Sequence, residues 1–261
     1  MPMIDTHCHL DFDAFSQDRD AVWAECRAAG VDAIIIPGVE IRQWRQLFAL
    51  VRHQPDWYGA VGVHPWWVND LAIAPGQLQQ AVTERVNAEC NAGSRCVAVG
   101  ECGLDKLNDT PLERQLAAFR PQLAAACDLN LPVIVHAVKA HSEVLRELKH
   151  FRPARGGVIH AFSGSEEIAR QYWSLGFHLG IGGTITYERA AKTRNTVAAV
   201  PLESLLLESD APDMPHAGRQ GERNSPSYLP AVAETLAQLR GVSLQTITDS
   251  TTENARRLFG L

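Results

Sequence analysis

The chain has 261 residues, of which 46% are hydrophobic and 21% charged, and its formal net charge at pH 7 is −6. This composition is typical of a globular protein, and the acidic balance argues against the broad positive surface of a passive nucleic-acid binder. No segment has the pattern of a membrane span or of a secretion signal. We therefore expect a cytoplasmic protein without membrane contact, whose six cysteines are mostly small, buried and reduced thiols.

Eight short apolar runs, most of them rich in valine and isoleucine, recur along the chain and indicate strands. Apolar runs of this length without polar alternation are typical of parallel strands covered on both faces. The predicted strands lie at residues 3–6, 33–37, 57–63, 96–100, 132–135, 157–160, 177–181 and 205–208.

Helical patterns separate these strands. They cover residues 18–29, 41–53, 76–92, 111–129, 141–150, 165–175 and 186–199, and after a polar loop at 211–226 they continue at 227–240, 243–249 and 251–259. Eight strands alternating with helices predict an α/β protein whose residues 1–261 form a single-domain (β/α)8 TIM-type barrel. An open doubly wound sheet is the structural alternative.

Ionisable side chains follow six of the eight predicted strands, at the end where barrel enzymes carry their active sites. They are His7 and His9, His64, Glu101 and Asp105, His136, His160, and Glu208 and Asp210. Because side chains alternate along a strand, His7 and His9 project to one face and Cys8 to the other. Four histidines (7, 9, 136 and 160) with two carboxylates (Glu101 and Asp210) are a suitable ligand set for two divalent ions, which predicts hydrolytic chemistry.

These strand ends resemble the TatD family of metal-dependent hydrolases, within the amidohydrolase superfamily, and in particular its YjjV-like branch. The resemblance extends over nearly the whole chain, in order and at family-like spacing. Its motifs are His7-x-His9, Gly100-Glu101-x-Gly103-Leu104-Asp105, His136, His160-x-Phe162-x-Gly164 and Glu208-Ser209-Asp210-Ala211-Pro212.

The resemblance implies a barrel with two metal ions and deoxyribonuclease activity, in which a metal-bound hydroxide attacks a phosphodiester of DNA. By position, His7, His9, Glu101 and Asp210 would bind one ion, and Glu101, His136 and His160 the other. Glu101 would bridge the ions, and Asp210 would also orient the attacking water and accept its proton. The ions would be magnesium, manganese or zinc. Nucleic acid is the expected partner, and no protein partner is evident.

Several residues near the predicted site are candidates for binding the substrate. His64 would either bind a phosphate or carbonyl oxygen or be a loop histidine before Pro65. Trp66 and Trp67 would either stack a nucleobase or pack at the rim. Arg219 and Arg223 would either supply local positive charge or lie in a solvated loop. Two positions depart from the family pattern: Lys106, which would meet a phosphate or pair with Asp105, and Ser225, where a glutamate is expected.

Other functions remain open from the residues alone, because a metal pair also hydrolyses amides, esters, lactones and aminoacyl esters. A protein that binds metal or nucleic acid without turnover is the non-enzymatic alternative. The spare carboxylate of Asp210 argues against it, since structural metal sites close their coordination. His178 is expected to be structural, and neither Cys8 nor Cys102 is a candidate nucleophile.

Overall fold

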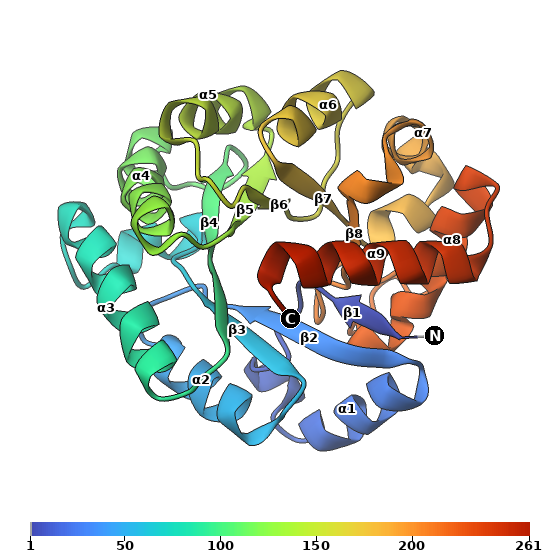
Figure 1. Cartoon of the computed structure of the whole chain (residues 1–261), viewed down its shortest axis with the longest axis horizontal. Coiled ribbons are helices and arrows are strands. Elements are labelled where there is room, and N and C mark those ends of the chain that lie inside the picture. The colour runs from blue at the N-terminus through green and yellow to red at the C-terminus, as the bar shows by residue number, and fades with distance from the viewer. Residues whose placement is uncertain (1) are drawn as a thin grey trace. The chain divides into compact units, whose positions relative to one another are not determined.

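The structure, a computed structural model, describes residues 2–261, and strands alternate with helices along the chain (Figure 1). All eight predicted strands are present, and their bounds are β1 Met3–Asp5, β2 Val31–Pro37, β3 Trp57–Val61, β4 Cys96–Asp105, β5 Val133–Val138, β6 Gly157–Ile159, β7 Phe177–Ile181 and β8 Leu205–Leu207. The α-helices are α1 Arg19–Ala28, α2 Trp44–His53, α3 Leu78–Asn91, α4 Leu112–Leu129, α5 His141–Phe151, α6 Glu166–Ser174, α7 Ala191–Ala199, α8 Leu229–Arg240 and α9 Leu244–Phe259.

The eight strands belong to one sheet, in which hydrogen-bonded neighbours follow the order of the chain from β1 to β8. The strand pairs β1–β2, β3–β4, β4–β5, β5–β6 and β7–β8 are parallel. Just beyond β1, the Thr6 amide donates to the carbonyl oxygen of Leu207 in β8 at 3.0 Å. A doubly wound sheet would instead permute the strand order. The predicted (β/α)8 barrel class is therefore confirmed.

The chain divides into two compact units. The first contains the residues up to Ile36, Ala161–Ser174 and His178–Leu261, and the second contains Pro37–His160 and Leu175–Phe177. The single domain expected over residues 1–261 stays a prediction.

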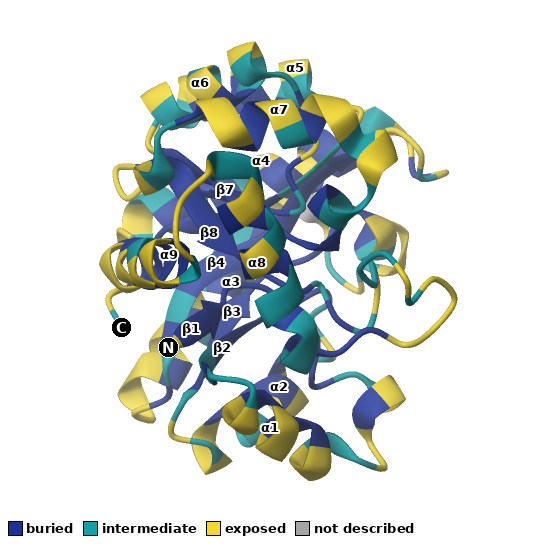
Figure 2. Ribbon diagram, turned by 90° about the vertical axis from the view of Figure 1, so that its right-hand side faces the viewer, coloured by how far each residue is buried: buried dark blue, intermediate teal, exposed yellow. Residues whose placement is uncertain are grey.

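In the first unit, the core strands β7 and β8 are buried while the outer turns of α9 are exposed (Figure 2). Ser243 caps α9 by accepting a hydrogen bond from the Thr246 amide at 3.0 Å, and Asn254 donates to Leu205 of β8 at 2.9 Å. The prediction of two helices here, 243–249 and 251–259, is wrong. The Thr251 hydroxyl donates to the carbonyl of Ile247 at 2.8 Å, and the expected break at residue 250 lies inside one continuous helix.

The segment before α7 is also less helical than predicted. The helix expected from residue 186 begins only at Ala191, after short 3-10 turns at Gly183–Thr186 and Glu188–Ala190. Tyr187 has an extended backbone between these turns, and its hydroxyl donates to the carbonyl of Pro215 at 2.7 Å. This tether to another loop interrupts the helix.

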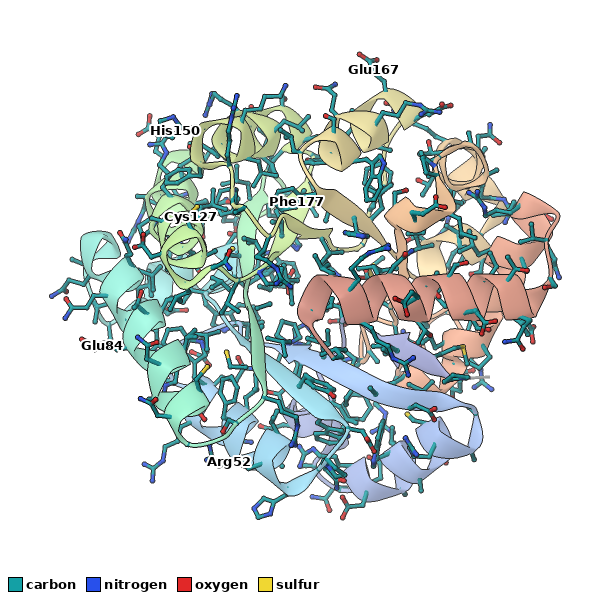
Figure 3. The ribbon with its side chains drawn as sticks, in the orientation of Figure 1. Arg52, Glu84, Cys127, His150, Glu167 and Phe177 are labelled. Carbon is teal, nitrogen blue, oxygen red and sulfur yellow. The ribbon has the colours of Figure 1, made fainter. Side chains whose placement is uncertain are left out.

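In the second unit, α2, α3, α4 and α5 lie outside the strands β3 to β6 (Figure 1). Glu84 and His150 lie on exposed outer positions of their helices, whereas Phe177 is fully buried (Figure 3). Two buried glutamines of α4 hold the backbone at the ends of strands β3 and β4. Gln122 exchanges two hydrogen bonds with Val63 at 2.7 and 3.0 Å, and Gln115 does the same with Asp105 at 2.7 and 2.8 Å.

Gly103 in β4 is a position where only glycine fits. Its φ is +149°, and an added Cβ would fall on the carbonyl oxygen of His136 in β5. We expect Gly103→Ala to lower the free energy of unfolding by about 3 kcal/mol or more, because both the backbone and the neighbouring strand would have to shift.

Urea unfolding followed by circular dichroism measures this loss. The matched control is Gly76→Ala, because a Cβ at Gly76 meets no atom within 4 Å, and we expect a change within about 0.5 kcal/mol. Equal stabilities of the two variants would contradict the steric argument.

The cysteines follow the expectation in part. All six are free, and Cys8, Cys26, Cys96 and Cys102 are buried, but Cys90 is exposed and Cys127 only partly covered. Within residues 2–261, none of the helices is long and apolar enough to cross a bilayer.

Candidate metal centre

Three predicted ligands meet in the first unit, and we call His7, His9 and Asp210 the first ligand cluster. The two Nε2 atoms of the histidines are 3.3 Å apart, and Oδ1 of Asp210 lies 3.7 Å from His7 and 3.8 Å from His9. Both histidines are buried, while the Asp210 side chain keeps 15% of its surface exposed. The cluster therefore presents two imidazole nitrogens and one accessible carboxylate oxygen to a common point.

Backbone contacts between the ends of β1 and β8 hold this cluster. The Asp210 amide donates to the carbonyl of His7 at 2.9 Å, and Asp210 adopts a φ of +58°, which only a small fraction of non-glycine residues do. Asp5 lies beneath them, and its Oδ1 accepts hydrogen bonds from the amides of His7 at 3.2 Å and Ser209 at 2.9 Å. Burial raises the pKa of Asp5 to about 7. The ring of Phe12 stacks on His9 at 4.5 Å and limits its rotation.

Four side chains meet in the second unit, and we call Glu101, His64, His136 and His160 the second ligand cluster. Their common point is Oε1 of Glu101, which lies 2.9 Å from Nδ1 of His136, 3.5 Å from Nε2 of His64 and 4.0 Å from Nε2 of His160. Glu101 and His160 are buried, with 2% and 5% of their surfaces exposed. Three imidazoles therefore surround a single carboxylate oxygen.

The spacing of the donor atoms fits a divalent ion in each cluster. Zinc binds nitrogen and oxygen at about 2.0–2.2 Å, so two ligands of one tetrahedral ion are about 3.4 Å apart. The distances of 3.3, 3.7 and 3.8 Å in the first cluster lie close to this value. In the second cluster, Oε1 of Glu101 lies 2.9 Å from His136 and 4.0 Å from His160, one distance below this value and one above it. Imidazole ligands suit zinc, and carboxylate ligands also admit manganese and magnesium.

Strand β4 runs further than predicted and adds a residue that the sequence prediction did not include among the site residues. The strand continues to Asp105, so Glu101, Gly103 and Asp105 lie on one face of it. Oδ2 of Asp105 lies 3.2 Å from Nε2 of His136, whose other nitrogen faces Glu101. The signal was present in the sequence, because alternation from Glu101 places Asp105 on the same side.

The two carboxylates determine the charge of His136. Burial lowers the pKa of His136, but the hydrogen bonds with Asp105 and Glu101 outweigh it and raise the pKa above its ordinary value. For Asp105 the directions are reversed. Burial raises its pKa, but the hydrogen bonds that it accepts from His136 and Trp66 outweigh burial and hold the pKa well below its usual range. Asp105 is therefore an ionised partner that fixes the orientation of the His136 ring.

We expect Asp105→Asn to weaken metal binding by about 10- to 100-fold, as is usual when the hydrogen-bond partner of a ligating histidine is removed. The dissociation constant of Mn²⁺, measured by electron paramagnetic resonance on metal-stripped protein, tests this. Asp109→Asn is the matched control, because Asp109 is exposed in the loop that follows β4. Equal Mn²⁺ affinity of the two variants would show that Asp105 has no part in the site.

His64 and Trp66 lie beside the second ligand cluster. Nδ1 of His64 accepts a hydrogen bond from the Trp66 amide at 3.2 Å, and the His64 ring packs against His136 at 4.3 Å. Trp66 is 52% exposed, and its indole Nε1 donates to Asp105 at 2.8 Å. Trp67 stacks on Trp66, with ring centroids 6.2 Å apart. The exposed indole is thus held at a fixed angle.

Three cations considered as substrate ligands are already paired. Lys106 binds Glu143 at 2.6 Å rather than Asp105, Arg223 binds Asp18 at 2.6 Å, and Arg219 binds Glu222 at 2.8 Å. Ser225, at the other departure from the family pattern, accepts a hydrogen bond from the Ser227 amide at the start of a short 3-10 helix. These contacts favour structural roles for all four residues.

The residues that the sequence excluded from the site have the surroundings of structural residues. Cys8 and Cys102 are fully buried, and burial raises the pKa of both thiols well above the ordinary value, which makes them poor nucleophiles. His178 is buried in β7, with its ring 5.1 Å from that of Trp173.

The family model "TatD related DNase" matches residues 4–260. The chain is 41% identical over 260 residues to the uncharacterized metal-dependent hydrolase YjjV of Escherichia coli, covering 99% of this chain and 98% of that protein. It is 34% identical over 266 residues to the 3′-5′ ssDNA/RNA exonuclease TatD of Escherichia fergusonii, covering 99% of each. The crystal structure of E. coli YjjV, a TatD homolog, matches with a TM-score of 0.92 over 99% of this chain and 98% of that one.

Proposed function

The chain belongs to the TatD family of metal-dependent hydrolases, and from this premise we propose that it is a nuclease that hydrolyses phosphodiester bonds of DNA. The observation that carries the proposal is the gathering of histidine and carboxylate ligands at the carboxyl ends of parallel strands, which is where barrel enzymes act. The exonuclease activity of a 34% identical relative supports nucleic acid as the substrate.

The proposed ligand assignment follows the family pattern. His7, His9, Asp210 and Glu101 would hold one divalent ion, and Glu101, His136 and His160 the other. The position of Glu101 supports a bridging role, because three imidazoles already converge on one of its oxygens. When bound, the two ions would polarise the phosphoryl oxygen and lower the pKa of water at the site. Magnesium, manganese and zinc are the candidates.

Asp210 is the proposed proton acceptor. Its carboxylate is the more accessible part of the first ligand cluster, and the hydrogen bond from its own amide to His7 fixes its backbone. A carboxylate held within hydrogen-bond reach of water can orient the water and take up its proton as the phosphorus–oxygen bond forms. The proton then passes to solvent or to the departing oxygen.

His64 is the proposed phosphate ligand. Because its Nδ1 accepts from the Trp66 amide, the neutral ring carries its proton on Nε2. That N–H can donate to a phosphate oxygen. Trp66, exposed and fixed by Asp105, offers a flat surface on which a base of the strand can stack, worth about 1–3 kcal/mol per base.

Degradation of 5′-labelled oligonucleotides tests the proposal. Metal-stripped protein is resupplied with Mg²⁺, Mn²⁺ or Zn²⁺ and offered single-stranded and duplex DNA, with RNA in parallel. We expect cleavage only with added metal. If every oligonucleotide stays intact while an ester, lactone or aminoacyl ester is hydrolysed, the metal centre stands and the DNA substrate is wrong. If metal binds and no substrate of either kind is turned over, the protein is a binding protein instead.

A further inference from the structure

A cavity in the first unit shares no lining residue with either ligand cluster. It has a volume of about 250 Å³, and we call it the Tyr187 pocket. Its lining comes from the segment after β7 and the loop after β8, and consists of Thr184, Tyr187, Arg189, Ala190, Met214 and Pro215. Both segments follow the carboxyl ends of their strands, and Met214 is only four residues beyond Asp210 in the same loop.

The walls of the pocket are held together by hydrogen bonds between these two segments. The Tyr187 hydroxyl donates to the carbonyl of Pro215 at 2.7 Å, and the Ala217 amide donates to the hydroxyl of Thr186 at 2.7 Å. The backbones approach so closely that a Cβ at Gly183 would lie 2.5 Å from the carbonyl oxygen of Met214. The pocket is therefore formed before any ligand enters, which lowers the entropic cost of binding.

The chemistry of the lining suits a flat, aromatic ligand that carries negative charge. The guanidinium carbon of Arg189 lies over the Tyr187 ring, 4.7 Å from its centre, so the lining places a cation directly on an aromatic ring. Met214 adds a polarisable apolar wall. Arg189 is exposed and makes no ion pair in the described part of the chain, whereas Arg219 and Arg223 are neutralised by carboxylates. Its N–H donors are available to an anion.

We propose that the Tyr187 pocket binds one nucleotide of the DNA strand, with the base against Tyr187 and Met214 and the adjacent phosphate on Arg189. This inference rests on the proposed function and specifies where that substrate is held. Bases stack readily on aromatic rings and on guanidinium planes, and arginine recognises phosphate through paired N–H donors. The volume is below the range of about 300–1,000 Å³ that is usual for sites of drug-sized ligands, so it accommodates a single nucleotide base and not a longer segment.

Binding of deoxyadenosine 5′-monophosphate in the presence of a chelator isolates the pocket from the metal centre. The wild-type protein is titrated by isothermal calorimetry beside Arg189→Ala, Tyr187→Leu and Arg256→Ala. Arg256 is the matched control, because it is an exposed arginine on α9. Melting temperatures and near-ultraviolet circular dichroism establish that each variant is folded.

We expect saturable binding to the wild type with a dissociation constant on the order of 1 mM, and the same value for Arg256→Ala. Arg189→Ala should weaken binding about tenfold, and Tyr187→Leu should weaken it at least severalfold. Deoxyadenosine should bind in a manner that depends on Tyr187 and not on Arg189. Equal affinity of all four proteins, or no binding by the wild type, would overturn the proposal. It would also be overturned if Arg189→Ala weakened the binding of inorganic phosphate and of the nucleotide equally while Tyr187→Leu had no effect.

The two proposals fail separately. If DNA is cleaved in the presence of metal but the nucleotide does not bind as expected, the pocket is wrong and the nuclease stands. If the nucleotide binds with the expected dependence on Arg189 and Tyr187 but no oligonucleotide is cleaved, the pocket stands as a nucleotide site and the nuclease assignment is wrong.

Discussion

Asp210→Asn is expected to lower the rate of DNA hydrolysis by about 10²- to 10⁴-fold, the range typical of a lost general base. An amide has nearly the same shape as a carboxylate, so the hydrogen bond from the residue 210 amide to His7 is retained. What is lost is the oxygen that accepts the proton of water. Because Asp210 is also a proposed metal ligand, the rate is measured at saturating metal, so that weaker binding of the ion does not account for the loss.

The measurement is single-turnover cleavage of a labelled single-stranded oligonucleotide over a range of Mn²⁺ concentrations. Asp249→Asn is the matched control, because Asp249 is exposed on α9 and bonds only Gln245 of the same helix among the contacts described. It should cleave at the wild-type rate. A rate for Asp210→Asn within a few fold of the wild type at saturating Mn²⁺ would remove Asp210 from the chemistry.

Glu101→Gln is expected to abolish high-affinity binding of metal in the second ligand cluster and to reduce hydrolysis by more than about 100-fold. Its carboxylate oxygen is the common partner of His64, His136 and His160, and it is almost fully buried. A neutral amide at that position offers a weaker ligand and presents N–H donors to neighbouring imidazoles. Loss of a residue that binds the ion directly should reduce metal affinity and activity by more than the 10- to 100-fold that is typical when only the hydrogen-bond partner of a ligand is removed.

The metal content per chain, measured by plasma mass spectrometry after dialysis against a low concentration of Zn²⁺, tests this expectation. The wild type should retain two ions and Glu101→Gln at most one. Glu84→Gln is the control, because Glu84 lies on the exposed side of α3 and bonds Gln80 (Figure 3). Two ions retained by Glu101→Gln would show that this carboxylate does not bridge them.

The fold was predictable because buried parallel strands consist mainly of apolar residues, which can be recognised in the sequence. Runs such as residues 133–135 and Leu205–Leu207 are apolar and buried at every position, since both faces are covered. Helix ends were less predictable where tertiary contacts override local signals. The threonines of α9 resemble a new helix start in sequence, yet Thr251 bonds within the helix. The hydroxyl of Tyr187 delays the start of α7 by reaching Pro215, 28 residues further along the chain.

The candidate ligands could be proposed from the sequence because each ends or follows a predicted strand, and the strand ends of a parallel sheet share one edge. The partners of the charged side chains around the site could not be predicted. The pairing of Lys106 with Glu143, or of Arg223 with Asp18, joins residues 37 and 205 positions apart, and no local pattern encodes such a choice. The hydrogen bonds of Gln122 to the end of β3 and of Gln115 to the end of β4 could not be predicted either, since a glutamine on a helix usually faces solvent. Only Asp105 had a local signal, its spacing from Glu101.

The measurement that tests the central claim most directly is anomalous diffraction from crystals grown with Zn²⁺, recorded on both sides of the zinc absorption edge. The account predicts two strong anomalous peaks per chain. One should lie about 2.0–2.2 Å from the nitrogens of His7 and His9 and an oxygen of Asp210, and the other at the same range from His136, His160 and Glu101. Absence of a peak at either cluster, or zinc bound only to surface residues elsewhere, would contradict the two-metal centre on which the proposed nuclease depends.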